Sequence, residues 1–307
     1  MQPAARDRKG FRHWCNRAQV GWLLVKAVKQ FVDTGGPFPR RQDIPSGSLL
    51  IGAPPRGRRL FVVSHGWETE VHPSPGGHKM RQLAAALARN AAADDDLVFF
   101  DFCSNPQEAK MGSVFMPQHV PWEGAPARSC AADAYFEQHG LTRPLKGRSP
   151  EEKRAFGVAM FEMSRLYCYR DCEVIVLPEL HGPDEHPGGK VWGVINEVPY
   201  ENRGWCCAEF SIALYSTSHQ PAARIINLGD PSVQRVLTQS RKWPTNVTEY
   251  AEMMKYTLNS PTSAEQAEGL KQDKSLGVNF TAKGDRSFVK YNFFKFTMGP
   301  HENLLRE

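Results

Sequence analysis

The chain has 307 residues, of which 41% are hydrophobic and 23% charged, a composition typical of globular proteins that excludes a disordered or fibrous one. Its formal net charge of +5 comes from 38 lysines and arginines against 33 aspartates and glutamates, scattered along the chain except for short basic runs such as Arg56 to Arg59. Nucleic-acid binding favours a denser basic stripe, so we expect a solvated surface and no nucleic-acid partner.

The N-terminal region carries apolar side chains at helical spacing from Phe11 to Val32, and the pattern ends at Thr34-Gly35-Gly36-Pro37. We expect one amphipathic helix that packs against the rest of the chain, although its basic face would also suit an anionic lipid surface. A Pro- and Gly-rich connector follows from 36 to 56. We therefore assign residues 1–58 to an N-terminal helix and connector.

The centre of the chain alternates short apolar runs with helix-sized segments. The apolar runs, which predict buried parallel strands, are 59–64, 97–102, 172–177 and 223–227. Helices are expected from Gly77 to Asn90, from Ser149 to Tyr169 and from Trp205 to Tyr215, with serine as the cap of the second. This alternation predicts an α/β domain over 59–228, with a central parallel sheet and helices on both faces.

Two long connections decorate this domain. Residues 103–149 have no steady period and many prolines, and residues 178–199 are rich in Gly, Pro and His, although 191–198 has room for a short strand. Beyond Gly229 we expect an irregular extension, 229–307, with a helix near 246–258 and an amphipathic end at 285–296.

Cysteine usage and hydropathy bear on the compartment. Seven cysteines without dense spacing predict free thiols in a reducing compartment. Cys168 and Cys172 are spaced like half of a zinc site, but no matching second pair follows. No apolar stretch is long enough to span a bilayer, and no signal-peptide pattern stands near the N-terminus, so we expect a cytoplasmic location.

Polar residues follow the predicted strands where parallel sheets bind ligands, beyond the carboxyl ends of the strands. These residues are Ser64, His65, Trp67 and Glu68 after the first strand, Asp101 in the second, Glu179 and His181 after the third, and the start of the helix that holds Glu209.

Glu209 is the strongest candidate among them. Trp205 and Glu209 stand four residues apart on one helical face, and an aromatic plane beside a carboxylate suits a sugar or nucleoside. An alternative stays open, in which Trp205 and Phe210 pack in the core while Glu209 complements the helix dipole or pairs with Arg203.

The stretch Tyr200 to Phe210, with Trp205-Cys206 and Glu209, resembles the Trp-Cys-x-x-Glu segment of TIR domains, notably those of plant immunity. The likeness covers about 59–228, and the whole pattern is also similar to an uncharacterised TIR-like group of algae and protists. It implies a flavodoxin-like fold. The connections 103–149 and 178–199 depart from the family, in which they are shorter.

The resemblance implies an NAD glycohydrolase in signalling or stress, with no cofactor, NAD as substrate and Glu209 as the catalytic carboxylate at the ribosyl centre. Trp205 or Trp67 would stack on a ring, and Gly76 and Gly77 at a helix N-terminus would receive the pyrophosphate. The residues Ser64, His65 and Asp101 complete the expected binding site. The expected partners are NAD or a related nucleotide and, as in other TIR-like modules, further copies of the chain.

Two other hypotheses remain open. One is a metal-dependent hydrolase, in which His65, His72 and His78 join Asp101 as ligands, although they lack the spacing that places two ligands on one helical face. The other is a non-catalytic TIR-like module that signals by self-association, with Glu209 structural.

Overall fold

A computed structural model describes residues 8–34, 38–69, 72–107, 148–181, 196–219, 224–254, 278–280, 285, 289 and 292–293. The predicted loop over 103–149 and the predicted strand at 191–198 therefore lie largely outside the described residues, as does most of the predicted end at 285–296.

The described residues form a six-stranded sheet in the order β2-β1-β4-β3-β5-β6. Its strands are β1 (Gly21–Leu24), β2 (Leu49–Ile51), β3 (Leu60–His65), β4 (Leu97–Phe99), β5 (Cys172–Leu177) and β6 (Arg224–Ile225). The strand β3 pairs in parallel with β4 and β5, and β5 pairs in parallel with β6. The four predicted strands are therefore confirmed as parallel members of one sheet.

The predicted continuous helix from Phe11 to Val32 is wrong. The segment forms α1 (Arg8–Arg17), then β1, then α2 (Val25–Thr34). The chain turns at Gln19, which has a φ of 46°, and β1 then pairs antiparallel with both β2 and β4. An added Cβ at Gly21 would lie 2.8 Å from the carbonyl oxygen of Ser104, so this position needs glycine. Sheet pairing therefore overrides the local helical period.

Helices connect the parallel strands, as the sequence predicts. They are α3 (His78–Arg89) between β3 and β4, then α4 (Asp101–Ser104), α6 (Pro150–Glu162) and η4 (Met163–Tyr167) between β4 and β5, and η7 (Tyr200–Asn202) and α7 (Gly204–His219) between β5 and β6. The helices α8 (Pro231–Arg235), η8 (Val236–Ser240, a π-helix) and α9 (Val247–Met253) follow the last strand, and the short turn η2 (Arg41–Asp43) precedes β2. Ser149 caps α6 in a reciprocal capping box with Glu152, which confirms the predicted start of that helix.

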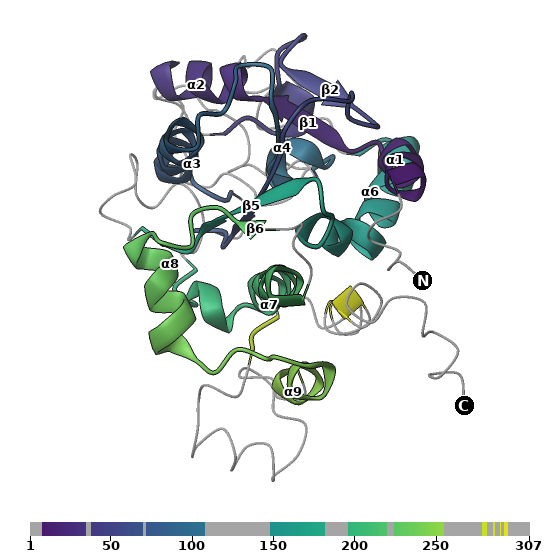
Figure 1. Ribbon diagram of the computed structural model, residues 1–307. Coiled ribbons are helices and arrows are strands. Elements are labelled where there is room, and N and C mark those ends of the chain that lie inside the picture. Colours follow the sequence, from purple (N-terminus) through teal and green to yellow (C-terminus); the bar gives the residue numbers. More distant parts are fainter. Residues whose placement is uncertain are drawn as a thin grey trace, which may run out of the picture.

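Helices cover both faces of the sheet. In Figure 1, α2 and α3 lie on one side of the strands, and α7 and α8 lie on the other. Alternate residues of β3 point to opposite faces: Leu60 and Val62 join the core cluster beneath α7, whereas Phe61 and Val63 join the cluster beneath α2 and α3. The fold is thus α/β, with a mixed sheet between two helical layers.

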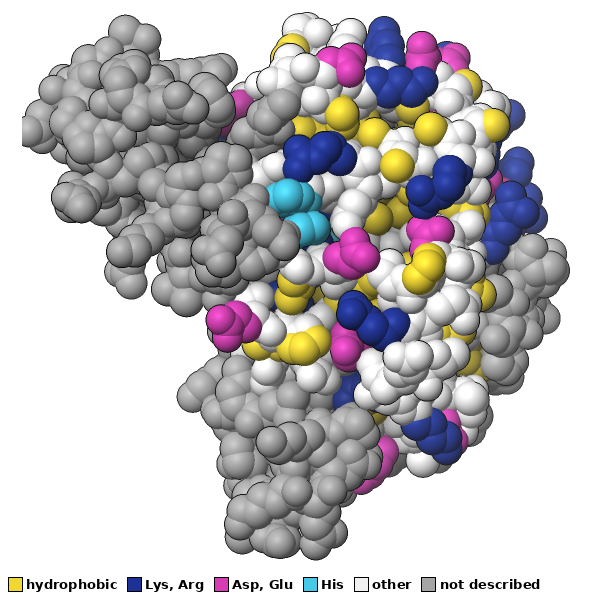
Figure 2. Space-filling view, turned by 90° about the vertical axis from the view of Figure 1, so that its left-hand side faces the viewer, with side chains coloured by type: hydrophobic (Ala, Val, Ile, Leu, Met, Phe, Trp, Pro, Cys, Tyr) yellow, Lys and Arg dark blue, Asp and Glu magenta, His cyan; other side chains and the backbone are white. Residues whose placement is uncertain are grey.

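The surface and the cysteines agree with ordinary globular behaviour. On the face shown in Figure 2, Lys and Arg side chains are interspersed with Asp and Glu over the described atoms. The cysteines at 15, 103, 168, 172, 206 and 207 are all buried and free. A search of the described helices finds none with the length and apolarity that crossing a bilayer requires.

Candidate active site

The helix α7 begins where three segments meet. The amide of Gly204 donates to the carbonyl of Asn279 at 2.8 Å, and Arg203 forms a β-bridge with Asn279. Phe280 packs so closely on Gly204 that an added Cβ would lie 2.0 Å from its ring. Glycine at the first position of α7 is therefore a packing requirement, and it seats the helix against residues from the C-terminal extension.

A pocket of about 610 Å³ lies at this helix start. It is lined by His65, Gly66, Trp67, Asp101, Asn105, Gln107, Phe156, Met160, Met163, Asn196, Val198, Arg203, Gly204, Trp205, Cys206, Glu209, Asn279 and Phe280. The carboxyl end of β3 and the residues after β4 contribute to it, as expected for the ligand edge of a parallel sheet. Trp205 and Glu209 both line it, as their helical spacing predicts.

Glu209 is buried among neutral hydroxyl groups. The residue is 7% exposed, and its carboxyl group accepts a hydrogen bond from Ser64 Oγ at 2.6 Å. The Ser64 hydroxyl in turn lies 2.6 Å from the hydroxyl of Tyr200, so the three residues form a buried chain of hydrogen bonds. Burial raises the pKa of Glu209 to about 8. The hydrogen bonds from Ser64 and Tyr167 lower this pKa in part, and the nearby charge of Asp101 raises it further.

Asp101 occupies the opposite electrostatic state. Its carboxylate accepts hydrogen bonds from His65 Nε2 at 2.8 Å, from Trp67 Nε1 at 3.1 Å and from the amide of Phe102 at 2.6 Å. Burial alone would raise the pKa of Asp101, but these partners, His65 foremost, bring it below its usual range. One pocket thus holds an ionised carboxylate and a protonated one, the pattern of paired groups with divided acid and base roles.

Arg203 is not the partner of Glu209, so that part of the alternative interpretation of this helix is wrong, whereas Phe210 is buried in the core as the same interpretation expects. Its guanidinium donates to three backbone carbonyls, those of Trp67, Val198 at 2.6 Å and Asn196 at 2.9 Å. The guanidinium also covers Gly66, where an added Cβ would lie 2.9 Å from Nη1. Arg203 therefore joins the loop after β3 to the segment before α7, and its charge serves backbone structure.

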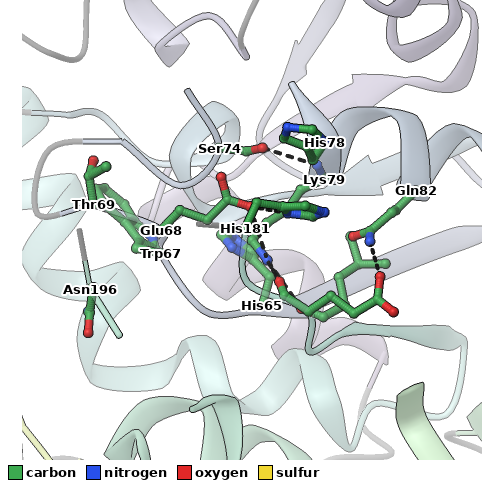
Figure 3. A network of polar contacts seen from close by, with 12 residues as sticks. His65, Trp67, Glu68, Thr69, Ser74, His78, Lys79, Gln82, His181 and Asn196 are labelled. Atoms are coloured by element: carbon green, nitrogen blue, oxygen red, sulfur yellow. Dashed lines mark hydrogen bonds and ion pairs between the residues drawn. The ribbon is translucent and has the colours of Figure 1, made fainter. Parts of the chain in front are cut away.

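A second polar network lies behind the pocket loop. The carboxylate of Glu68 is fully buried, accepts from His181 Nδ1 at 2.9 Å and lies 3.9 Å from Lys79 Nζ. In Figure 3 the Glu68 side chain points toward His181 and Lys79, which come from the segment after β5 and from α3. Lys79 also donates to the carbonyl of Glu179 at 2.6 Å. Burial lowers the pKa of Lys79 to about 8, an effect that Glu68 opposes.

The structure separates the remaining predicted residues. Ser64 is buried behind Glu209 and is not among the pocket-lining residues, so it contacts the carboxylate and not the cavity. Gly76 and Gly77 are buried at the N-terminus of α3, where Gly77 is the cap with a φ of 69°, and they do not line this pocket.

The three histidines of the metal hypothesis have separate partners. His65 bonds Asp101, the ring of His72 lies 3.0 Å from the carbonyl of Phe38, and His78 stacks on His181 with ring centroids 3.9 Å apart. Within the part of the chain that the structure describes, no group of three or more His, Cys, Asp or Glu side chains is arranged to hold a metal ion.

Sequence reasoning missed several residues in and around the pocket. Tyr200 does not line the pocket but lies beside Ser64 behind it, and its position before the helix was a usable signal for a buried partner. Asn105, Asn279 and Phe280 carried no such signal, because they reach the pocket only through tertiary packing.

Comparison of the chain with protein-family models, with curated proteins and with solved structures finds no match in any of the three.

Proposed function

We propose that the chain is a TIR-like NAD glycohydrolase that cleaves the bond between nicotinamide and ribose. The observation that carries this proposal is the position of Glu209: it is buried, lies on one helical face with Trp205, and lines a pocket at the carboxyl edge of the sheet. The resemblance of 200–210 to the TIR segment supplies the reaction, and the pocket supplies room for a ribosylated ring.

The strand order supports a flavodoxin-like assignment. The parallel strands stand in the order β4-β3-β5-β6 across the sheet. When these four are numbered from 1 to 4 along the chain, the order is 2-1-3-4, which is the beginning of the flavodoxin-like order 2-1-3-4-5. The antiparallel strands β1 and β2 extend the sheet beyond β4 and are an addition to that plan.

In the proposed reaction, the bond between the ribosyl C1′ and the ring nitrogen breaks, and its electron pair leaves with the ring as neutral nicotinamide. Water then adds to C1′ and gives up one proton, so NAD⁺ and water become nicotinamide, ADP-ribose and H⁺. Positive charge develops on the ribose in the transition state, where an ionised carboxylate stabilises it. Glu209 takes this role in its ionised form, which is the minority form at pH 7 because burial raises the pKa of Glu209 to about 8. Ser64 donates to its carboxyl group, and Tyr200 lies within hydrogen-bond distance of Ser64.

The test is nicotinamide release from NAD by the purified chain. We expect wild-type protein to release nicotinamide, and Glu209→Gln to lower kcat by at least a hundredfold while the fold persists, since the change preserves shape and removes the charge. Glu151→Gln is the matched control, because Glu151 is an exposed carboxylate in the first turn of α6, away from the pocket. Full activity in Glu209→Gln would mean that another residue carries the reaction.

The second candidate is a non-catalytic module that self-associates. The observation in its favour is the edge strand β2, on which Leu50 and Ile51 are 38% and 52% exposed. Wild-type protein that releases no nicotinamide even at concentrations that permit self-association would favour this candidate.

A further inference from the structure

The described residues beyond α9 contribute to the pocket. These residues, 278–280, 285, 289 and 292–293, are called the C-terminal segment below. Asn279 and Phe280 line the cavity together with Trp205 of α7. In Figure 1 the C-terminal segment, drawn in yellow, lies beside α7. The TIR resemblance covers about 59–228, so it assigns no role to this segment.

Backbone pairing and core packing hold the segment at the start of α7. The amide of Asn279 donates to the carbonyl of Asn202 at 2.6 Å, and the amide of Gly204 donates to the carbonyl of Asn279 at 2.8 Å. Val278 and Phe280 are buried and belong to the core cluster beneath α7. The segment is therefore integrated into the fold at this point, and it does not merely lie on the surface.

A second anchor lies further along the chain. Phe293 is fully buried and stacks on Tyr250 of α9, with ring centroids 3.6 Å apart. The hydroxyl of Tyr250 donates to the carbonyl of Val289 at 3.3 Å, and Val289 is itself fully buried. Asp285 stands between the two anchors in the sequence, so the chain that carries it is fixed on both sides.

Asp285 connects the segment to an aromatic wall of the pocket. Its carboxylate accepts a hydrogen bond from the indole Nε1 of Trp205 at 2.9 Å. Trp67, which also lines the pocket, donates in the same way to Asp101 at 3.1 Å. An indole has a single N–H donor, and its hydrogen bond to a carboxylate is stronger than one to a neutral acceptor. Each ring is thus held by one aspartate, and for Trp205 that aspartate comes from the C-terminal segment.

Loss of this acceptor would release the Trp205 ring. Trp205 is only partly buried, so an indole N–H without Asp285 would turn toward water to find a partner. Trp205 stands one helical turn before Glu209 on the same face, so this rotation would change the wall beside the carboxylate. A ring that stacks on the substrate contributes equally to the ground state and the transition state, so its displacement raises KM and leaves kcat nearly unchanged.

We propose that Asp285 is a positioning residue of the active site, which holds the Trp205 ring in the orientation that binds the substrate. The inference rests on the proposed function and extends it, because it places a determinant of substrate affinity outside the region of the TIR resemblance. Docking of the C-terminal segment on α7 and α9 is then a condition for tight binding.

The first test follows the indole N–H of Trp205 by NMR in the full chain, labelled with ¹⁵N at its tryptophan side chains. Trp205→Phe removes one signal and so identifies it. We expect Asp285→Ala to move this proton upfield, because the hydrogen bond to a carboxylate is lost, and Asp285→Asn to move it less, because the amide keeps an acceptor. Asp33→Ala is the matched control, since Asp33 is an exposed aspartate of α2, and it should leave the signal in place.

The second test is steady-state kinetics with NAD. Asp285→Ala should raise KM about tenfold and change kcat by about twofold at most, whereas Asp33→Ala should behave as wild type. In the Trp205→Phe background, Asp285→Ala should have no further effect on KM, because the carboxylate acts only through the indole N–H. A merely structural role for Asp285 would instead give the same effect in both backgrounds.

Three results would overturn the inference: an unchanged Trp205 signal in Asp285→Ala, a shifted signal with an unchanged KM, or equal effects of the substitution in the two backgrounds. If Asp285→Ala does not fold, Asp285→Asn decides, since it retains the size of the side chain, and a Trp205 signal identical to that of wild type would overturn the inference. Wild-type protein that cleaves no NAD would contradict the proposed function alone, because the indole signals need no substrate and still show whether Asp285 holds Trp205.

Discussion

Glu209 makes folding stability depend on pH. Its pKa is about 8 in the folded chain against 4.5 as the ordinary value, so the folded state binds the proton more tightly than the unfolded state. The stability that comes from this proton is fully present below pH 4.5, declines as the pH rises, and is lost above pH 8. Over that window the loss amounts to roughly 3–5 kcal/mol, since each pKa unit corresponds to about 1.4 kcal/mol.

Glu209→Gln should therefore be more stable than wild type above pH 8, and the advantage should shrink toward pH 5. The amide keeps the shape of the carboxylic acid and never ionises, so it avoids the cost of a buried charge. Urea denaturation at pH 5, 7 and 8.5 measures the difference, with Glu151→Gln as the control for an exposed carboxylate. A difference between the two proteins that is the same at all three pH values would contradict a buried, proton-binding Glu209.

At the residue scale, spacing along α7 predicted correctly that Trp205 and Glu209 line one pocket, but the suggested pairing of Glu209 with Arg203 is wrong. Trp205 and Glu209 share a pocket because four residues make about one helical turn, a purely local relation. The contacts of Ser64 and Arg203 were not predictable in the same way, because they depend on which strands and loops stand opposite α7. Ser64 points to the same face of β3 as Leu60 and Val62, because alternate residues of a strand point to opposite faces. It therefore contacts Glu209 of α7 and does not line the pocket.

At the scale of elements, the junction of α7 with the C-terminal extension admits only glycine. Gly204→Ala should displace Phe280, whose ring stands 2.0 Å from the new methyl group, and so open the pocket wall. We expect a destabilisation of about 1–3 kcal/mol, as for other overpacked sites, and a raised KM for NAD. Thermal melting and steady-state kinetics measure the two effects.

Gly157→Ala is the matched control for this substitution. Gly157 lies inside α6, and an added Cβ there meets nothing within 4 Å. Alanine should stabilise the helix by about 0.5–1 kcal/mol and leave the kinetics unchanged. If Gly204→Ala behaves like Gly157→Ala, the close packing of Phe280 on α7 is not a feature of the folded chain.

Elements whose signal is local were predictable, and those that depend on pairing were not. The capping box at Ser149 and the apolar runs of β3 and β5 identify themselves in the sequence. The strand β1 does not, because its four residues continue an apolar pattern that also fits a helix, and only the pairing of Leu23 with Val98 and Leu49 settles its conformation.

At the scale of the molecule, the N-terminal segment is part of the sheet. The strand β1 lies between β2 and β4, and the ring of Trp22 is fully buried in the core. A chain of residues 59–307 would lose both strands and α2, exposing the edge of β4 and the core cluster that α2 covers. We expect this truncated chain to lack a cooperative thermal transition, measured by calorimetry.

Adding residues 1–58 as a separate polypeptide provides the control for that truncation. If the fold needs only the strands and helices of this segment, the added fragment should restore a cooperative transition in part. A truncated chain that melts cooperatively at the wild-type temperature would instead show that 59–307 folds on its own. The parallel orientation of the four central strands was predictable from their alternation with helices, whereas the extra antiparallel edge required knowledge of which side of the sheet was still open.

The seating of Phe280 on α7 also sets an order of events during protein synthesis. A ribosome adds Glu209 about 70 residues before it adds Phe280, an interval of roughly 4–14 s at ordinary elongation rates. Through that interval the nascent chain already contains the buried carboxylate and both tryptophans, but it lacks the ring that covers the start of α7. The cavity therefore gains its last described wall late in translation, so a chain interrupted soon after α7 carries Glu209 without an enclosed place for a ligand to bind.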